Sequence, residues 1–275
     1  MTTPTIAFIG GGNMAASLIG GLVADGWDAD RIRVADPDGS RRERLASSHG
    51  VHTASDNCTT AAGADIVVLA VKPQALKAVC DEIAATIGGR SALVISIAAG
   101  IREPDLRRWL GAGTAIVRTM PNTPALVQTG ATGLYANPQV SGPQREMAET
   151  VMRAVGLALW VEDEALLAAV TALSGSGPAY HFLFMEALEE AGIQLGLSAE
   201  PARLLSLQTA LGAAKMALES SDSTAVLRRR VTSPGGTTER ALAVLEDGRL
   251  RELVARALAA AAERARELGD ELGGQ

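Results

Sequence analysis

Cysteine and histidine are scarce in this sequence, and their placement excludes several kinds of site. Cys58 and Cys80 lie in segments with separate helical patterns and form no CxxC pair, so neither a disulfide framework nor a zinc site is expected. The three histidines lack obvious acidic partners, and no His, Asp and Glu cluster has the spacing of metal ligands. Ser174 and Ser176 lack the G-x-S-x-G turn of a serine hydrolase. We therefore expect neither metal-dependent nor nucleophilic hydrolysis.

Long apolar runs and an excess of positive charge are missing as well. No apolar run approaches the ~18 residues that a membrane-spanning helix needs, and the first residues lack the basic and apolar segments of a secretory leader. The net charge of −6 argues against a nucleic-acid or anionic-membrane surface, and the basic triplet at 228–230 fits a solvated helix face. We expect a cytoplasmic protein that binds neither nucleic acid nor a membrane.

What the sequence does contain is a glycine-rich turn near its start. Residues 5–9 predict a strand, and residues 13–22 have the spacing of a helix. Between and within them, Gly10, Gly12 and Ala15 occupy the G-x-G-x-x-G/A positions of the dinucleotide fingerprint. Such a turn lets a pyrophosphate approach the backbone, and the following helix offers it N–H groups and the positive end of its dipole. The predicted contacts are Gly10, Gly12, Asn13 and Met14.

Strand and helix patterns alternate to about residue 163. Further strands are predicted at 31–36, 65–71, 92–98, 115–120, 131–135 and 158–161, with helices at 41–48, 73–87, 104–110 and from Ser141. Strands at this spacing with helices between them predict an α/β fold with a doubly wound, Rossmann-type sheet. We predict a dinucleotide-binding domain over residues 1–163.

Strand patterns stop at about Glu164, and the remainder is rich in Ala and Leu with helical periodicity. The last predicted helix, about 252–268, is apolar around much of its circumference, so it should pack on several sides. We predict an all-helical second domain over residues 164–275, in which such a helix would fit an oligomer as readily as a thick monomer core.

The choice between NADH and NADPH stays open from the residues. Asp36, at the predicted end of the second strand, has the position of the carboxylate that binds the ribose hydroxyls of NAD and repels a 2′-phosphate. Arg41 and Arg42 follow closely, and an arginine at this rim can hold that phosphate through charge-assisted hydrogen bonds. The alternative for the arginine pair is a solvated helix start. Asp36 alone favours NADH.

Three segments follow directly after later predicted strands, at residues 70–74, 96–100 and 118–124. Open α/β sheets bind ligands at the carboxyl ends of their strands, so these segments should line the nicotinamide half of the cofactor. Lys72 and Asn122 are the polar candidates there. A solvated lysine and an Asx turn would explain the two residues equally well.

A second glycine-rich turn, Ser-Pro-Gly-Gly-Thr-Thr at residues 233–238, lies in the helical half. Gly235 and Gly236 let consecutive N–H groups converge, and the following helix adds its own, so the turn suits a carboxylate or phosphate. Thr237 and Thr238 add hydroxyl groups, and a capped helix connection is the alternative. Hydride transfer to a protonated C=N bond would fit such a site, because the cofactor supplies the chemistry and the protein mainly orients the reactants.

Taken together, these motifs resemble pyrroline-5-carboxylate reductase. The resemblance covers nearly the whole chain and rests on segments 8–15, 70–73, 96–100, 118–125, 174–180, 214–216 and 233–238. The first is shared by many dehydrogenases, whereas the last, in a helical domain behind a Rossmann domain, is highly specific. The resemblance implies an NADPH- or NADH-dependent oxidoreductase that reduces 1-pyrroline-5-carboxylate to L-proline, the last step of proline biosynthesis. It also implies a homodimer with interlocked helical domains, often assembled into a decamer.

The resemblance also implies roles for individual residues. Ser233, Gly236 and Thr237 would hold the substrate carboxylate, and Thr238 would hydrogen-bond the ring nitrogen as the catalytic residue. The cofactor-binding residues implied toward the nicotinamide end are Ala70, Val71, Lys72, Pro73, Ala98 and Asn122. Members of this family often have a small or hydroxylic residue where Asp36 stands, so their usual preference for NADPH is in doubt in this chain.

Two other classes of protein compete with this interpretation. A β-hydroxyacid dehydrogenase-like enzyme shares the first glycine turn but needs a catalytic lysine between its domains, and Lys215 lacks the expected glycine-rich approach and following Asn. A cofactor-binding sensor would bind NAD(P)H without turning over a cyclic imine, and the complete turn at 233–238 speaks against that alternative.

Overall fold

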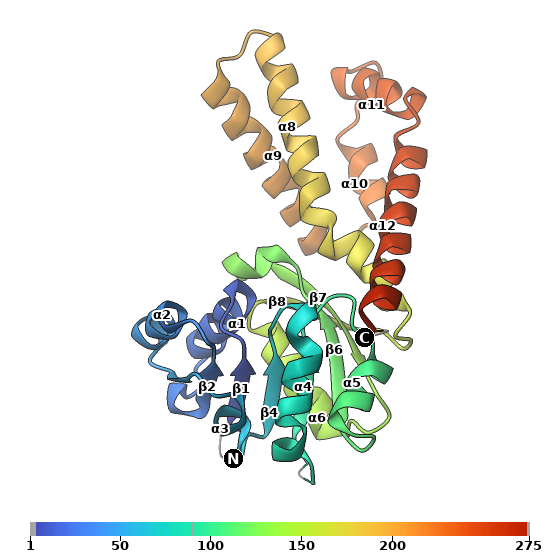
Figure 1. The fold of residues 1–275 in the computed structure, drawn as a ribbon. Coiled ribbons are helices and arrows are strands. Elements are labelled where there is room, and N and C mark those ends of the chain that lie inside the picture. The colour runs from blue at the N-terminus through green and yellow to red at the C-terminus, as the bar shows by residue number, and fades with distance from the viewer. Residues whose placement is uncertain (1–3, 90, 274–275) are drawn as a thin grey trace. The chain divides into compact units, whose positions relative to one another are not determined.

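In the computed structural model, which describes residues 4–89 and 91–273, the first part of the chain forms an eight-stranded sheet in the order β3-β2-β1-β4-β5-β6-β7-β8 (Figure 1). The strands are β1 (Ile6–Ile9), β2 (Ile32–Ala35), β3 (His52–Ala54), β4 (Ile66–Leu69), β5 (Leu93–Ser96), β6 (Ala115–Met120), β7 (Gly130–Ala136) and β8 (Gly156–Trp160). Strands β1 to β6 are parallel, β7 is antiparallel to β6, and β8 is parallel to β7. The strand order reverses at β1, where doubly wound sheets bind dinucleotides.

Helices cover both faces of this sheet. One core joins it to α1 (Asn13–Ala24), α2 (Gly39–His49) and α6 (Gly142–Arg153), and the other joins it to α3 (Asn57–Ala61), α4 (Pro73–Ile87) and α5 (Glu103–Leu110). Ile6 and Phe8 of β1 belong to the first core and Ala7 and Ile9 to the second, because side chains alternate across a strand. All four are 0% exposed, which explains why the strand is a continuous apolar run.

The later part of the chain is helical. Its elements are α7 (Leu166–Val170), the π-helix η3 (Thr171–Gly175), α8 (Gly177–Gln194), α9 (Ala199–Glu219), α10 (Thr224–Arg230), α11 (Thr237–Asp247) and α12 (Leu250–Gly273). Two short 3-10 helices, η1 (Ala29–Arg31) and η2 (Thr123–Val127), lie within the sheet region. Within residues 4–89 and 91–273, no helix is both long and apolar enough to cross a membrane.

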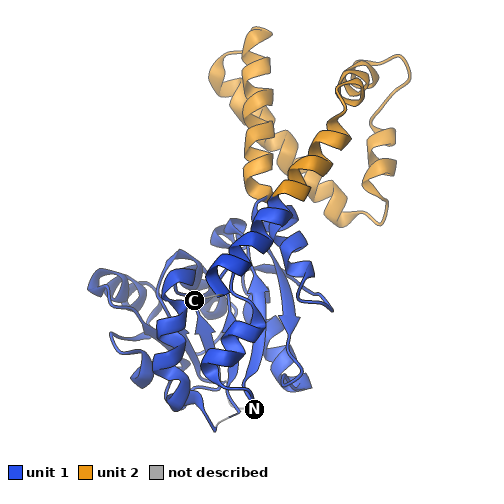
Figure 2. Ribbon diagram, turned by 45° about the vertical axis from the view of Figure 1, so that its right-hand side comes forward, with its two compact units in different colours: residues 1–176, 261–275 blue, residues 177–260 orange. Residues whose placement is uncertain are grey.

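The chain forms two compact units, which Figure 2 distinguishes by colour. Unit 1 takes in the chain up to Ser176 and again from Ala261, and unit 2 is Gly177–Ala260. The end of α12 belongs to unit 1 because Arg102 pairs with Asp270 at 2.8 Å and donates to the carbonyl oxygen of Arg266 at 3.0 Å. The predicted second domain, residues 164–275, includes all of α12, and that domain division stays a prediction.

The α/β fold with a Rossmann-type sheet and a helical C-terminal region is confirmed. Helix α4 has the bounds predicted for it, and Ser141 and Gln144 form a capping box at the start of α6, as their spacing predicts. Strand β3 was not predicted, because it has only three residues and His52 and Thr53 give it no apolar alternation.

Candidate active site

The first glycine turn joins β1 to α1 at the carboxyl edge of the sheet. Gly10 has φ +102°, and a Cβ there would lie 2.6 Å from the carbonyl oxygen of Ala70, so this position requires glycine. Gly12 has φ −69°, and no described residue other than its chain neighbours comes within 4 Å of the point that its Cβ would occupy. Glycine at position 12 therefore relieves no strain, but it leaves open space against the backbone, as a pyrophosphate requires.

The backbone N–H groups of this turn fall into two sets. The N–H of Gly10 donates to the carbonyl oxygen of Ala35, and that of Gly11 donates to Oδ2 of Asp36, each at 2.8 Å. The N–H groups of residues 12–15 have no hydrogen-bond partner within the described part of the chain. Such unsatisfied groups at a helix N-terminus form an anion site, so the residues present fit a dinucleotide.

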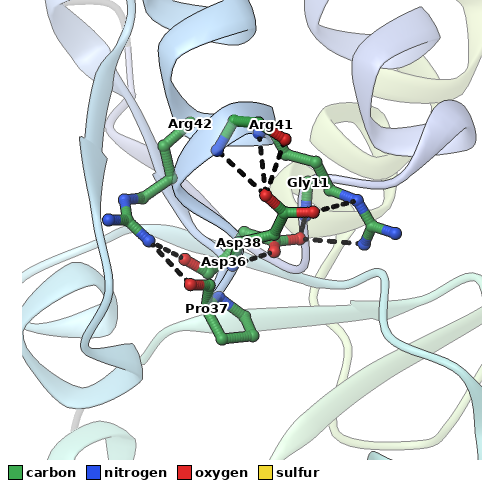
Figure 3. Close-up of polar contacts among 7 residues, drawn as sticks. Gly11, Asp36, Pro37, Asp38, Arg41 and Arg42 are labelled. Carbon is green, nitrogen blue, oxygen red and sulfur yellow. Dashed lines mark hydrogen bonds and ion pairs between the residues drawn. The ribbon is translucent and has the colours of Figure 1, made fainter.

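Asp36 follows β2 and is 3% exposed, and both of its carboxylate oxygens accept hydrogen bonds from backbone N–H groups (Figure 3). Oδ2 accepts from Gly11, Oδ1 accepts from the N–H of Asp38 at 2.9 Å, and Nη1 of Arg41 lies 3.5 Å from Oδ2. Nη1 of Arg42 donates to the carbonyl oxygens of Asp36 and Pro37. Ribose binding by Asp36 stays a prediction.

Asp38 is the second carboxylate at this edge. Its Oδ1 accepts from the hydroxyl of Ser40 at 2.7 Å and from the backbone N–H of Ser40 at 2.9 Å, which caps α2. The hydrogen bond from the Ser40 hydroxyl is the main reason why the pKa of Asp38 lies below its usual value. Arg41 Nε lies 3.5 Å from Oδ2 of Asp38, so the Arg41 guanidinium stands between two carboxylates.

The residues expected toward the nicotinamide end lie at the same edge of the sheet, because β4, β5 and β6 are parallel and each ends there. Those after β4 are Ala70, Val71, Lys72 and Pro73, Ala98 follows β5, and Asn122 follows β6. Lys72 is exposed and precedes α4, whose first residue is Pro73. Cofactor contact by these residues stays a prediction.

The side chain of Asn122 holds three segments together. Its Nδ2 donates to the carbonyl oxygen and the hydroxyl of Ser174, each at 3.2 Å, and its Oδ1 accepts from the N–H of Ala131 at 2.9 Å. The loop after β6 is thereby fixed to β7 and to the π-helix η3, and π-helical turns are frequent at functional sites. The sequence did not predict this link, since Ser174 is 52 residues away and only the glycine- and serine-rich break at 174–178 marks the place.

The second glycine turn lies in unit 2 and leads into α11. Gly235 has φ +68°, and its N–H donates to Oε2 of Glu239 at 2.7 Å. The N–H of Gly236 donates to the carbonyl oxygen of Ser233 at 3.0 Å. Among the described residues, the N–H groups of Thr237 and Thr238 have no partner, and both residues are exposed. These two amides therefore form the free part of the predicted anion site.

Glu239 was not among the predicted site residues. Its position three residues after Gly236, the N-cap of α11, is the capping-box spacing of a helix start, which is the signal that could have drawn attention to it. No group of three or more His, Cys, Asp or Glu within the described ranges could hold a metal ion.

Family models and a known protein that match this chain carry related descriptions. Residues 164–268 match the family model for pyrroline-5-carboxylate reductase dimerisation, and residues 5–100 match the one for NADP oxidoreductase coenzyme F420-dependent. A pyrroline-5-carboxylate reductase of Pseudomonas aeruginosa is 54% identical over 273 residues, covering 99% of this chain and 100% of that protein.

Two solved structures are similar over nearly their whole length. A pyrroline-5-carboxylate reductase from Coxiella burnetii has a TM-score of 0.95 and 53% identity, covering 97% of this chain and 99% of that one. Plasmodium falciparum pyrroline carboxylate reductase with NADP bound has a TM-score of 0.85 and 30% identity, covering 98% of this chain and 99% of that one.

Proposed function

The chain belongs to the pyrroline-5-carboxylate reductase family, and on this premise we propose that its two glycine turns share the reaction, the first binding the dinucleotide and the second the substrate. The protein is an oxidoreductase of proline biosynthesis that reduces 1-pyrroline-5-carboxylate to L-proline with NADPH or NADH. One observation supports the assignment of one ligand to each turn. Each turn leads into a helix whose first N–H groups have no partner in the described chain.

In unit 1, the free N–H groups of residues 12–15 bind the pyrophosphate, and the open space beside Gly12 admits it. The proposed residues of the cofactor site are Gly10, Gly12, Asn13, Met14, Asp36, Ala70, Val71, Lys72, Pro73, Ala98 and Asn122. Since the side-chain oxygen and nitrogen of Asn122 and both carboxylate oxygens of Asp36 already bond to protein groups, these two residues act mainly by shaping the backbone that meets the cofactor.

In unit 2, the N–H groups of Thr237 and Thr238 bind the substrate carboxylate, and Gly235 and Gly236 give the turn the shape that exposes them. Ser233 holds the turn closed through its carbonyl oxygen, which accepts from Gly236, and its exposed hydroxyl adds a contact to the carboxylate. Binding the carboxylate fixes one end of the five-membered ring and so restricts where its C=N bond lies.

Thr238 is the proposed catalytic residue. Its hydroxyl oxygen accepts a hydrogen bond from the protonated ring nitrogen, which orients the C=N bond and keeps the proton on that nitrogen while the neighbouring carbon is reduced. The dinucleotide, when bound, supplies the hydride. The product is then the secondary amine of L-proline, and the protein itself needs no metal or nucleophile for this step.

The chain is a homo-oligomer, consistent with the dimerisation family model over residues 164–268. We assign the cofactor domain to residues 1–163 and the substrate and dimerisation domain to residues 164–275, and the start of the matching family model supports that boundary. Exposed apolar side chains of unit 2 support a dimer formed by its helices, among them Phe182, Leu183, Phe184, Leu204, Leu205 and Leu211. Assembly of dimers into a decamer and a cytoplasmic location are further parts of the proposal.

The test is oxidation of NADH and of NADPH, followed at the nicotinamide absorbance with and without 1-pyrroline-5-carboxylate. We expect oxidation that depends on the substrate and yields L-proline in equal amount. Folded protein that binds either cofactor but oxidises neither in the presence of the substrate would contradict the proposed function.

A further inference from the structure

Each oxygen of the buried Asp36 carboxylate already accepts a hydrogen bond from the protein backbone. A carboxylate has about four acceptor sites, and here one oxygen takes the N–H of Gly11 at 2.8 Å and the other the N–H of Asp38 at 2.9 Å. Arg41 lies at 3.5 Å from the first of these oxygens, and the Asp36 side chain is 4% exposed. A ribose hydroxyl would have little access to these oxygens unless the carboxylate gave up a bond to the turn.

The bond to Gly11 lies within the cofactor turn itself. Gly11 stands between Gly10, whose conformation only glycine adopts readily, and Gly12, whose open side faces the expected pyrophosphate. Asp36 comes from the end of β2, 25 residues away, so this hydrogen bond ties the turn to the neighbouring strand. Charge-assisted hydrogen bonds to backbone N–H groups are among the stronger ones, particularly where water is excluded.

The two arginines beside Asp36 differ in how they are held (Figure 3). Nη1 of Arg42 donates to the carbonyl oxygens of Asp36 and Pro37 at 2.7 and 3.1 Å, so Arg42 fixes the backbone. Arg41 has a side chain that is 49% exposed and stands 3.5 Å from both Asp36 and Asp38. Because both separations are longer than usual charge-assisted hydrogen bonds, Arg41 can turn to another anion at little cost.

From these contacts we infer that Asp36 is a positioning residue for the cofactor turn, needed equally for NADH and NADPH, and that Arg41 is the residue that distinguishes the two by pairing with a 2′-phosphate. This inference rests on the proposed binding of the dinucleotide at residues 10–15. It assigns to Asp36 a role different from direct recognition of the ribose. The selective contact comes instead from Arg41, on the first turn of α2. Its exposed side chain can move away from Asp36 without disturbing the hydrogen bond between Asp36 and Gly11.

The experiment measures dissociation constants of NADH and NADPH from the full-length protein by nicotinamide fluorescence, with no imine substrate present. For Asp36→Ala we expect both constants to rise about tenfold, with their ratio changed less than about threefold. Asp36→Asn should recover most of that affinity, since an amide oxygen can still accept from Gly11. For Arg41→Ala we expect NADPH to weaken about tenfold and NADH less than about twofold.

Arg44→Ala is the matched control, because Arg44 is an exposed arginine of the same helix and lies outside this network. It should leave the ratio of the two constants unchanged. If Asp36→Ala does not fold, Asp36→Asn carries the same comparison, with melting temperature as the check on folding. Loss of NADH binding alone in either Asp36 variant, or equal loss of both cofactors in Arg41→Ala, would overturn the inference.

The outcomes separate this inference from the proposed function. Cofactor binding with the expected pattern but no reduction of 1-pyrroline-5-carboxylate would contradict the function and support the inference. Normal reduction with the opposite pattern in the variants would overturn the inference alone. A wild-type protein that bound neither cofactor would overturn both.

Discussion

The two glycine turns of this chain are built alike but are closed by different carboxylates. In each, a glycine N–H donates to a side-chain carboxylate: Gly11 to Asp36 at 2.8 Å and Gly235 to Glu239 at 2.7 Å. Asp36 is buried and directly follows strand β2, whereas Glu239 is exposed and belongs to the helix that its own turn precedes. The first bond is therefore part of the tertiary structure, and the second is a local one that water can replace.

This difference fits the two ligands. A dinucleotide pyrophosphate binds beside a turn that must already have its shape, so a buried carboxylate that fixes the turn is an advantage. The proposed substrate brings a carboxylate of its own, and Glu239 places a negative charge close to where that group would bind. An exposed side chain can move aside, since its hydrogen bond contributes little in water.

Thr238→Ala is expected to have the largest effect. Without the hydroxyl at the ring nitrogen, kcat/KM for 1-pyrroline-5-carboxylate should fall by roughly ten- to a thousandfold, the range for loss of one polar contact in the transition state. Steady-state kinetics give this value, and Thr238→Ser, which keeps the hydroxyl, should recover much of the loss. Equal activity in Thr238→Ala and the wild type would remove Thr238 from the mechanism.

Gly12→Ala tests the cofactor turn without disturbing it. Apart from its chain neighbours, a methyl group at position 12 meets no described residue within 4 Å, so the melting temperature should stay within a few degrees of the wild type. The same methyl group occupies space needed by the pyrophosphate, so NADH and NADPH should each bind at least about tenfold more weakly. Unchanged affinity for both cofactors would show that the pyrophosphate does not lie against Gly12.

Gly10→Ala is the companion to this variant. Its Cβ would lie 2.6 Å from the carbonyl oxygen of Ala70 in a backbone conformation that favours glycine, so here the melting temperature itself should fall.

Glu239→Gln sharpens the comparison between the two carboxylates. Removing the negative charge beside the free amides of Thr237 and Thr238 should lower KM for the substrate by about two- to fivefold and leave cofactor affinity unchanged. The matching change in the first turn, Asp36→Asn, should not improve binding of any ligand. A raised KM in Glu239→Gln would mean that the carboxylate supports the turn as Asp36 does.

The smallest expected effect is on the stability of α2. Asp38→Ala removes the N-cap and should lower the urea concentration at the unfolding midpoint slightly at neutral pH, measured by urea denaturation. Because the folded protein lowers the pKa of Asp38, the stabilisation exists above the unfolded-state value and is lost as the pH falls through the lower folded-state value. A difference between variant and wild type that persisted unchanged into strong acid would contradict this account of the cap.

The sequence could predict the elements that depend on local pattern. Apolar runs located β1, β4 and β5, and glycine spacing located both turns, because strand burial and tight turns leave periodic or compositional signals. It could not predict that Asp36 bonds Gly11 or that Asn122 bonds Ser174, since these contacts join residues 25 and 52 positions apart. Such contacts depend on the order of strands in the sheet, which periodicity does not determine.

The most direct test of whether the first turn binds the cofactor and the second the substrate is a kinetic comparison of Gly12→Ala and Thr238→Ala. The concentrations of the cofactor and of 1-pyrroline-5-carboxylate are varied in turn. We predict that Gly12→Ala raises KM for NADH and NADPH while KM for the imine changes less than about twofold. Thr238→Ala should lower kcat/KM for the imine while the cofactor dissociation constants stay as in the wild type. The reverse pattern, with Gly12→Ala acting on the imine or Thr238→Ala on cofactor binding, would contradict the assignment of one ligand to each turn.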